Sequence, residues 1–276
     1  MIIGQDKILS QINTFTIDSL PSAIMIVGEK GAGKHTIVNY IAERFKLIIE
    51  DITPQSSNKD DGTHLEFDEK INKMYEVTEP HLYLVDGDLL ASRGRGEMNA
   101  LLKVLEDPIY GSYIVFLCET TANILDTICN RCYQIQLERY TSETLKHFLG
   151  DGVDSRITEI VNTPGQVIAM TGYNIEDMVQ YASKVISSIK NANYANILNI
   201  SRKKISYDGD KDKYMPTHFI LVLMYVLKQQ YFTTEDNRLM SAYLLTNKLY
   251  NNSKIANIDM KNLFEHYLFE LKKTLA

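Results

Sequence analysis

Short apolar runs alternate with helical patterns in the first half of the chain. The runs cover residues 23–27, 82–85 and 113–118, and helically spaced apolar residues cover 36–45 and 98–105. Strands that alternate with helices are typical of a parallel sheet with helices on both faces, whose strands are apolar throughout. The pattern therefore predicts an α/β domain, and the strand-like runs end near Leu137. We place its boundary at residues 1–140.

Helical periodicity dominates the rest of the chain. Thr141 or Ser142 is placed to cap a first helix, and Thr163-Pro164-Gly165 marks another helix boundary. Apolar residues then recur at helical spacing from Ile175 to Ile189, and later helices are expected at 217–232, 235–250 and 259–274. We predict a small helical unit over 141–173 and an all-helical domain over 174–276. The polar stretch 55–62 predicts a surface loop.

Composition narrows the class of protein. The length of 276 residues fits two or three domains, and 29 basic against 35 acidic side chains give a net charge of −6. That balance argues against a surface that tracks nucleic-acid backbones, so such contacts would be local or made through partners. We see no signal peptide, and the apolar run 219–227 is too short for a membrane span. Three cysteines in such a chain predict reduced thiols, and we expect a cytoplasmic protein without membrane contacts.

A glycine-rich segment follows the first predicted strand. Gly28-Glu29-Lys30-Gly31-Ala32-Gly33-Lys34 fits the first seven positions of the phosphate-loop pattern G-x-x-x-x-G-K-[S/T] and precedes a predicted helix. Gly28, Gly31 and Gly33 let backbone N–H groups turn toward phosphate oxygens, and Lys34 can reach the terminal phosphates. The segment predicts a phosphate-binding loop.

The positions that normally support hydrolysis are altered. His35 stands where a hydroxyl would hold magnesium, and Thr36 lies about 100° further round the helix. Asp86 ends the second strand and can support a magnesium-bound water, but Gly87 stands where many ATPases carry a glutamate. Two interpretations stay open here: hydrolysis is lost or weak, or magnesium is held by water and Asp86 alone. Asp86 is also common as a plain turn residue.

Three later segments resemble one family. Asn99–Pro108 resembles the signature N-A-L-L-K-x-L-E-E-P, with Asp107 in place of a glutamate. Thr120–Cys132 resembles a stretch that runs from a sensor threonine to Ser-Arg-Cys, with Asn130 in the serine position. Thr163–Ala169 resembles a lid motif but lacks its arginine, and Gln166 and Ile168 occupy the candidate positions. With Gly4-Gln5, these segments resemble the AAA+ clamp-loader subunits of bacterial DNA polymerase III, and the departures fit the delta-prime branch best.

That resemblance implies a fold and a role. The fold would be an AAA+ P-loop module with a parallel five-stranded sheet, a helical lid and an all-α C-terminal collar that holds an oligomer together. The chain would act as a stator-like subunit that supports ATP-dependent loading of a sliding clamp onto primed DNA, with gamma/tau-like motor and delta subunits as partners. Arg131 would be donated in trans to a neighbouring ATPase site. The plainer interpretation of Arg131 is an ion pair within its own chain.

Two alternatives and two absences complete the expectations. An active AAA+ ATPase, such as the motor subunit, is the second hypothesis, and a P-loop kinase for a small molecule is the third. No cofactor is required by the first hypothesis, and ATP or ADP binding at the degenerate site stays open. We expect no metal site, because Cys129 and Cys132 lack two further ligands and residues 46–80 contain no cysteine for the zinc module of many relatives.

Overall fold

The chain is described by a computed structural model covering residues 2–54, 62–76, 79–207, 209, 213–254 and 258–276. It divides into two compact units, residues 1–140 and 141–276, and each is described by itself. Apart from Gly62, the loop predicted over 55–62 lies outside the described residues. The predicted boundary near residue 173 lies inside the second unit and stays a prediction.

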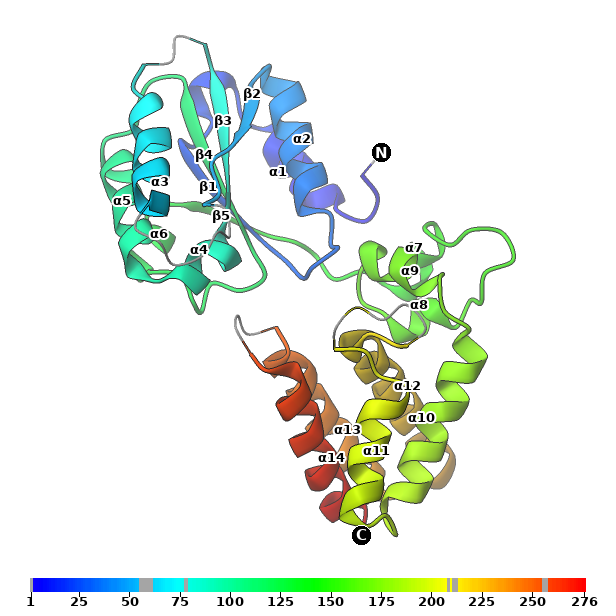
Figure 1. The fold of residues 1–276 in the computed structure, drawn as a ribbon. Helices are drawn as coiled ribbons and strands as arrows, with labels where there is room; N and C mark the ends of the chain where they lie inside the picture. The colour runs from blue at the N-terminus through cyan, green and yellow to red at the C-terminus, as the bar shows by residue number, and fades with distance from the viewer. Residues whose placement is uncertain (1, 55–61, 77–78, 208, 210–212, 255–257) are drawn as a thin grey trace. The chain divides into compact units, whose positions relative to one another are not determined.

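A parallel five-stranded sheet forms the centre of the first unit (Figure 1). Its strand order is β2-β3-β4-β1-β5. The strands are β1 (Ala23–Val27), β2 (Ile48–Asp51), β3 (His81–Asp86), β4 (Ser112–Cys118) and β5 (Tyr133–Gln136). The three predicted apolar strands are the three inner ones, because both of their faces are buried. The edge strands escape the hydrophobic pattern, since all four residues of β2 are exposed and only Ile135 of β5 is buried.

Helices cover both faces of this sheet. One face packs on α1 (Asp6–Asn13) and α2 (Lys34–Phe45), through Ile8, Ile12, Ile37 and Ile41. The other carries the remaining helices of the unit, which are α3 (Gly62–Lys73), α4 (Gly87–Arg93), α5 (Arg95–Glu106) and α6 (Asp126–Cys129). A 3-10 helix, Ile17–Ser19, precedes β1. The predicted α/β fold with helices on both faces is confirmed.

The second unit is entirely helical in its described residues, apart from an isolated bridge between Ile205 and Tyr214. Its helices are α7 (Ser142–Lys146), α8 (Ile157–Ile160), α9 (Pro164–Met170), α10 (Ile175–Ile189), α11 (Tyr194–Lys203), α12 (Pro216–Thr234), α13 (Asn237–Asn252) and α14 (Met260–Leu275). Of the two candidate caps for the first helix, Thr141 is the N-cap and accepts a hydrogen bond from Thr144 N. The helix boundary predicted at residues 163–165 is confirmed, and Thr163 caps α9 there by accepting from Gln166 N. None of the described helices combines the length and apolar character needed to cross a bilayer.

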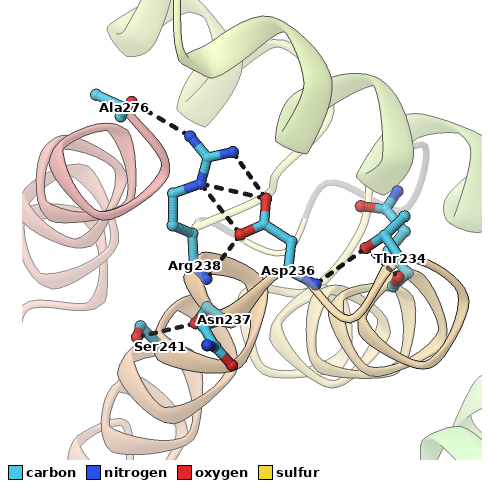
Figure 2. Close-up of polar contacts among 7 residues, drawn as sticks. Thr234, Asp236, Asn237, Arg238, Ser241 and Ala276 are labelled. Carbon is cyan, nitrogen blue, oxygen red and sulfur yellow. Dashed lines mark hydrogen bonds and ion pairs between the residues drawn. The ribbon is translucent and has the colours of Figure 1, made fainter.

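The turn between α12 and α13 is fixed by polar contacts (Figure 2). Asp236 caps α13 by accepting from Arg238 N, and the Arg238 guanidinium returns to the same carboxylate at 2.9 and 3.1 Å. Arg238 Nη1 also donates to the carbonyl oxygen of Ala276 at 3.5 Å, so the start of α13 is tied to the end of α14. The exposed ion pair between Arg238 and Asp236 orients the turn but adds little stability, because solvent screens the two charges.

Candidate functional site

The predicted phosphate loop joins β1 to α2. Gly31 and Gly33 have φ angles of 80° and 93°, in the left-handed region that favours glycine. Gly28 N donates to Cys118 O at 3.0 Å, and a Cβ on Gly28 would come within 3.0 Å of the Leu137 side chain. Glycine is therefore favoured at three points of the loop, by backbone conformation at Gly31 and Gly33 and by a close contact at Gly28. The loop has the backbone shape of a phosphate cradle at a helix N-terminus.

Lys34 lies inside this loop. Its Nζ donates to Gly28 O at 2.6 Å and to Glu29 O at 3.3 Å. Burial lowers the pKa of Lys34, and the carboxylates of Glu119 and Asp88 partly offset that effect. The ammonium group therefore lies among loop carbonyl oxygens, and bound phosphate oxygens would compete with these carbonyls for its hydrogen bonds. The backbone N–H groups and Lys34 are donors of the kind that bind phosphate oxygens.

The magnesium side of the site is weaker. His35 and Thr36 are both exposed on the first turn of α2, so neither side chain is enclosed by the site. Asp86 accepts a hydrogen bond from Leu89 N at 2.9 Å as the N-cap of α4. Its own N–H donates to Thr53 Oγ1 at 2.9 Å. The capping role that many turn aspartates play is thus present at Asp86, whereas magnesium binding there stays a prediction.

Position 87 has no room for a side chain. Gly87 is buried, and a Cβ built on it would overlap the Cys118 sulfur and lie 3.2 Å from the Leu117 carbonyl oxygen. A glutamate therefore cannot be placed here without moving β4 or its cysteine. The carboxylate missing from the sequence is excluded by the packing of the core.

Asp88 does not simply replace that glutamate. Its Oδ2 accepts from Glu119 N at 2.8 Å, which joins the start of α4 to the end of β4. Burial raises the pKa of Asp88, while the Glu119 backbone bond and the Lys34 charge act in the opposite direction. The carboxylate is therefore already engaged in fixing the end of the sheet.

The lid positions are used structurally in the second unit. Gln166 Nε2 donates to Tyr250 OH at 2.8 Å, and its Oε1 accepts from Asn162 N at 2.9 Å. Ile168, the other candidate position for the missing lid arginine, is 63% exposed. These two positions carry no positive charge for a nucleotide.

Arg131 lies near the N-terminal ends of the strands, whereas the phosphate loop lies at their C-terminal ends. It precedes β5, whose first residue Tyr133 pairs with Ile24 near the start of β1, whereas the loop follows the end of β1. Because parallel strands advance by about 3.3 Å per residue, the length of β1 separates the two ends by roughly 13 Å. Arg131 therefore does not serve the phosphate loop of its own chain.

The contacts of Arg131 also fit the plainer interpretation, which is an ion pair within its own chain. Arg131 Nη2 pairs with Glu106 Oε1 at 2.7 Å, and Nη1 donates to Thr127 O at 2.8 Å. The Arg131 side chain is 34% exposed and that of Glu106 is 53% exposed. An intrachain ion pair and a role toward a partner are compatible, since about a third of the Arg131 side chain remains exposed to solvent.

All three cysteines are free thiols. Burial raises the pKa of Cys132 to about 12 and also raises the pKa values of Cys118 and Cys129. Within the described parts of the chain, no three His, Cys, Asp or Glu side chains are grouped so as to hold a metal ion.

Sequence reasoning missed three residues that shape these sites. Cys118 closes position 87, Glu106 pairs with Arg131, and Tyr140 OH donates to Ala32 O of the phosphate loop at 2.8 Å. Each partner is far away in sequence, so no local pattern signals the contact. The one available clue was that Glu106 and Arg131 both lie in family-like motifs.

The strand order, the phosphate loop after β1 and the helices on both faces define an α/β P-loop domain of the AAA+ type. Residues 90–141 match the family described as DNA polymerase III, delta subunit. The chain is also 28% identical over 240 residues to DNA polymerase III subunit gamma of Buchnera aphidicola subsp. Schizaphis graminum, covering 75% of this chain and 64% of that protein. The chain is thus similar to delta- and gamma-type subunits of DNA polymerase III, each over part of its length. The finer delta-prime assignment is not confirmed, because the curated relative is a gamma subunit.

Solved structures from Thermotoga maritima are also similar. A DNA polymerase III gamma subunit-related protein has 15% identity and a TM-score of 0.49, with 99% of this chain and all of that chain covered. The RuvB Holliday junction branch migration motor has 16% identity and a TM-score of 0.48, with 64% of this chain and 63% of that chain covered.

Proposed function

We propose that this chain is a stator-like subunit of a clamp loader, of the delta-prime kind, which donates Arg131 to the ATP site of a neighbouring motor subunit. Within such an assembly it supports ATP-dependent loading of a sliding clamp onto primed DNA. Gamma-type motor and delta subunits are the proposed partners, and the second unit would supply the collar contacts. The protein would need no nucleotide turnover of its own.

The position of Arg131 carries this proposal. Its side chain is partly exposed near the N-terminal ends of the strands, and its own phosphate loop lies at their C-terminal ends. A phosphate that Arg131 contacts would therefore belong to another molecule. A guanidinium supplied in trans stabilises charge on the transferring phosphoryl group and increases its rate strongly. The similarity to gamma- and delta-type subunits supports an assembly in which such a neighbour exists.

The chain's own site supports the non-catalytic part of the proposal. Gly87 cannot carry the usual glutamate, His35 replaces the magnesium hydroxyl, and the lid positions lack arginine. Gly28, Gly31, Gly33 and Lys34 would still hold phosphates, with Asp86 near the metal side. Nucleotide bound there would lack a group to activate water, so binding without productive turnover is the expected behaviour.

The test is an assembly reconstituted with the motor and delta subunits of the same genome. Arg131→Ala should lower the rate of DNA-stimulated ATP hydrolysis at the adjoining site by on the order of 10³-fold. Arg139→Ala, which changes an exposed arginine of the same unit, is the matched control and should leave hydrolysis unchanged. Undiminished hydrolysis by an assembled Arg131→Ala complex would remove the proposed trans role.

A second candidate is an active AAA+ ATPase, such as the motor subunit itself. The intact backbone of the phosphate loop and the position of Lys34 favour it, as does the similarity to a gamma subunit. Phosphate release by the isolated chain separates the two functions. Turnover that disappears in Lys34→Ala would support the ATPase, whereas the stator proposal expects no turnover, even in His35→Thr, which restores the hydroxyl but leaves position 87 closed.

A further inference from the structure

The Arg131 guanidinium is held by two separate elements. Glu106, the last residue of α5, accepts from Nη2 at 2.7 Å, and Thr127 O, in α6, accepts from Nη1 at 2.8 Å. An arginine side chain is long and has many rotamers, so a single contact would leave the guanidinium plane free to turn. Two acceptors on different elements fix both the position and the plane of the group.

The remaining donors define what this held group can bind. A guanidinium has five N–H donors in a planar fork, and the two acceptors engage one hydrogen on each terminal nitrogen. Among the residues that the structure describes, the other donors have no hydrogen-bond partner, and the side chain is 34% exposed. Such a fork binds the oxygens of a phosphate in a defined direction, which a freely rotating arginine would have to find at each encounter.

We propose that Glu106 is a positioning residue that orients Arg131 toward the phosphate of the neighbouring subunit. This inference rests on the function proposed above, and it assigns a role to the carboxylate at the end of α5, which lies in the Asn99–Pro108 motif. Glu106 touches neither nucleotide nor substrate. It acts by reducing the number of orientations that Arg131 must give up when the transition state forms.

The negative charge of Glu106 works against this role, because a carboxylate next to the guanidinium repels an approaching phosphate. Its side chain is 53% exposed, however, so solvent and salt screen that repulsion. The orientation is not screened, because it depends on hydrogen-bond geometry rather than on long-range charge. The two effects predict opposite results when the carboxylate is removed, which makes the proposal testable.

The experiment compares Glu106→Ala, Glu106→Gln and Arg131→Ala in the reconstituted assembly, with Asp107→Asn as matched control. Asp107 is the adjacent carboxylate and forms no ion pair with Arg131 in the described structure. We expect Glu106→Ala to lower the kcat of DNA-stimulated hydrolysis by about three- to tenfold with an unchanged KM for ATP. Glu106→Gln keeps an oxygen acceptor and should retain most of the rate. The double variant Glu106→Ala/Arg131→Ala should match Arg131→Ala alone.

Each outcome decides one of the two proposals. If Arg131→Ala leaves the rate unchanged, the proposed function fails. If Arg131→Ala lowers the rate while Glu106→Ala leaves it unchanged or raises it, the function stands and the positioning role of Glu106 is refuted. A rise in both Glu106 variants would instead identify Glu106 as a competitor of the phosphate. A purely structural role would lower the thermal unfolding midpoint and change KM, and either result without a change in kcat overturns the proposal.

Discussion

The closed space at Gly87 gives the sharpest test of how the core shapes the site. A Cβ at this position would overlap the Cys118 sulfur and approach the backbone carbonyl oxygen of Leu117 to 3.2 Å. Gly87→Ala should therefore destabilise the first unit, and removal of the sulfur in Cys118→Ala should make room for the new methyl group. The two changes should offset each other in the double variant.

The size of the effect follows from the packing. Inserting a methyl group into a filled core costs about 1–3 kcal/mol, because side chains or backbone must move. Cys118 is completely buried, and losing its sulfur alone should cost about 1 kcal/mol through lost contacts. If the sulfur is the main obstacle, the double variant should be more stable than the sum of the single effects predicts, by about 1–2 kcal/mol.

Hydrogen exchange of the β3 and β4 amides is the suitable assay. The chain divides into two compact units, so one unfolding curve would combine the transitions of both, whereas exchange reports the free energy of opening of each region. Gly150→Ala is the control for exchanging a glycine, because its added Cβ would meet Val153 at an ordinary 3.6 Å. Its own unit should change by less than about 0.5 kcal/mol.

Additive effects would refute this reasoning. If the double variant equals the sum of the single variants within about 0.5 kcal/mol, Cys118 is not what closes position 87. The same packing predicts that Gly87→Glu alone gives no ATP turnover. Turnover by a folded Gly87→Glu chain would equally contradict it.

Three further predictions concern other contacts. Thr246→Val should lower the opening free energy of the α13 and α14 amides by about 1–3 kcal/mol in hydrogen exchange, because it leaves the buried Tyr267 hydroxyl without its 2.7 Å partner. Adding Tyr267→Phe should recover part of the loss. Burial beside Tyr173 OH lowers the pKa of His218 from its ordinary 6.5, so the folded state binds a proton less readily than the unfolded state. The free energy of unfolding should therefore fall as the pH drops below 6.5. His218→Phe should remove this part of the pH dependence, and an unchanged pH profile would contradict the prediction. Tyr140→Phe should cost about 0.5–1.5 kcal/mol in the first unit, since Ala32 O loses its 2.8 Å donor, and equal amide exchange in both proteins would show that the bond contributes nothing.

Much of the fold was predictable because burial leaves a local trace. β1, β3 and β4 are apolar on both faces, so a short continuous run marks each one. Predicted helices at 217–232, 235–250 and 259–274 correspond to α12, α13 and α14 within about two residues at each end. β2, β5 and α11 were not assigned, since the two strands are largely exposed edges and α11 is short with a mixed pattern.

The sequence by itself determined the composition of the candidate sites: the glycines of the phosphate loop, Lys34, the absent hydroxyl and glutamate, and Arg131 near the start of a strand. These are properties of residue type and local spacing. Only the tertiary structure decided that Gly87 faces Cys118, that Arg131 pairs with Glu106, and that Arg131 and the phosphate loop lie at opposite ends of the strands. Such relations depend on strand order and on the approach of distant segments, which a parallel sheet fixes through its hydrogen bonds and shared core rather than through any local pattern.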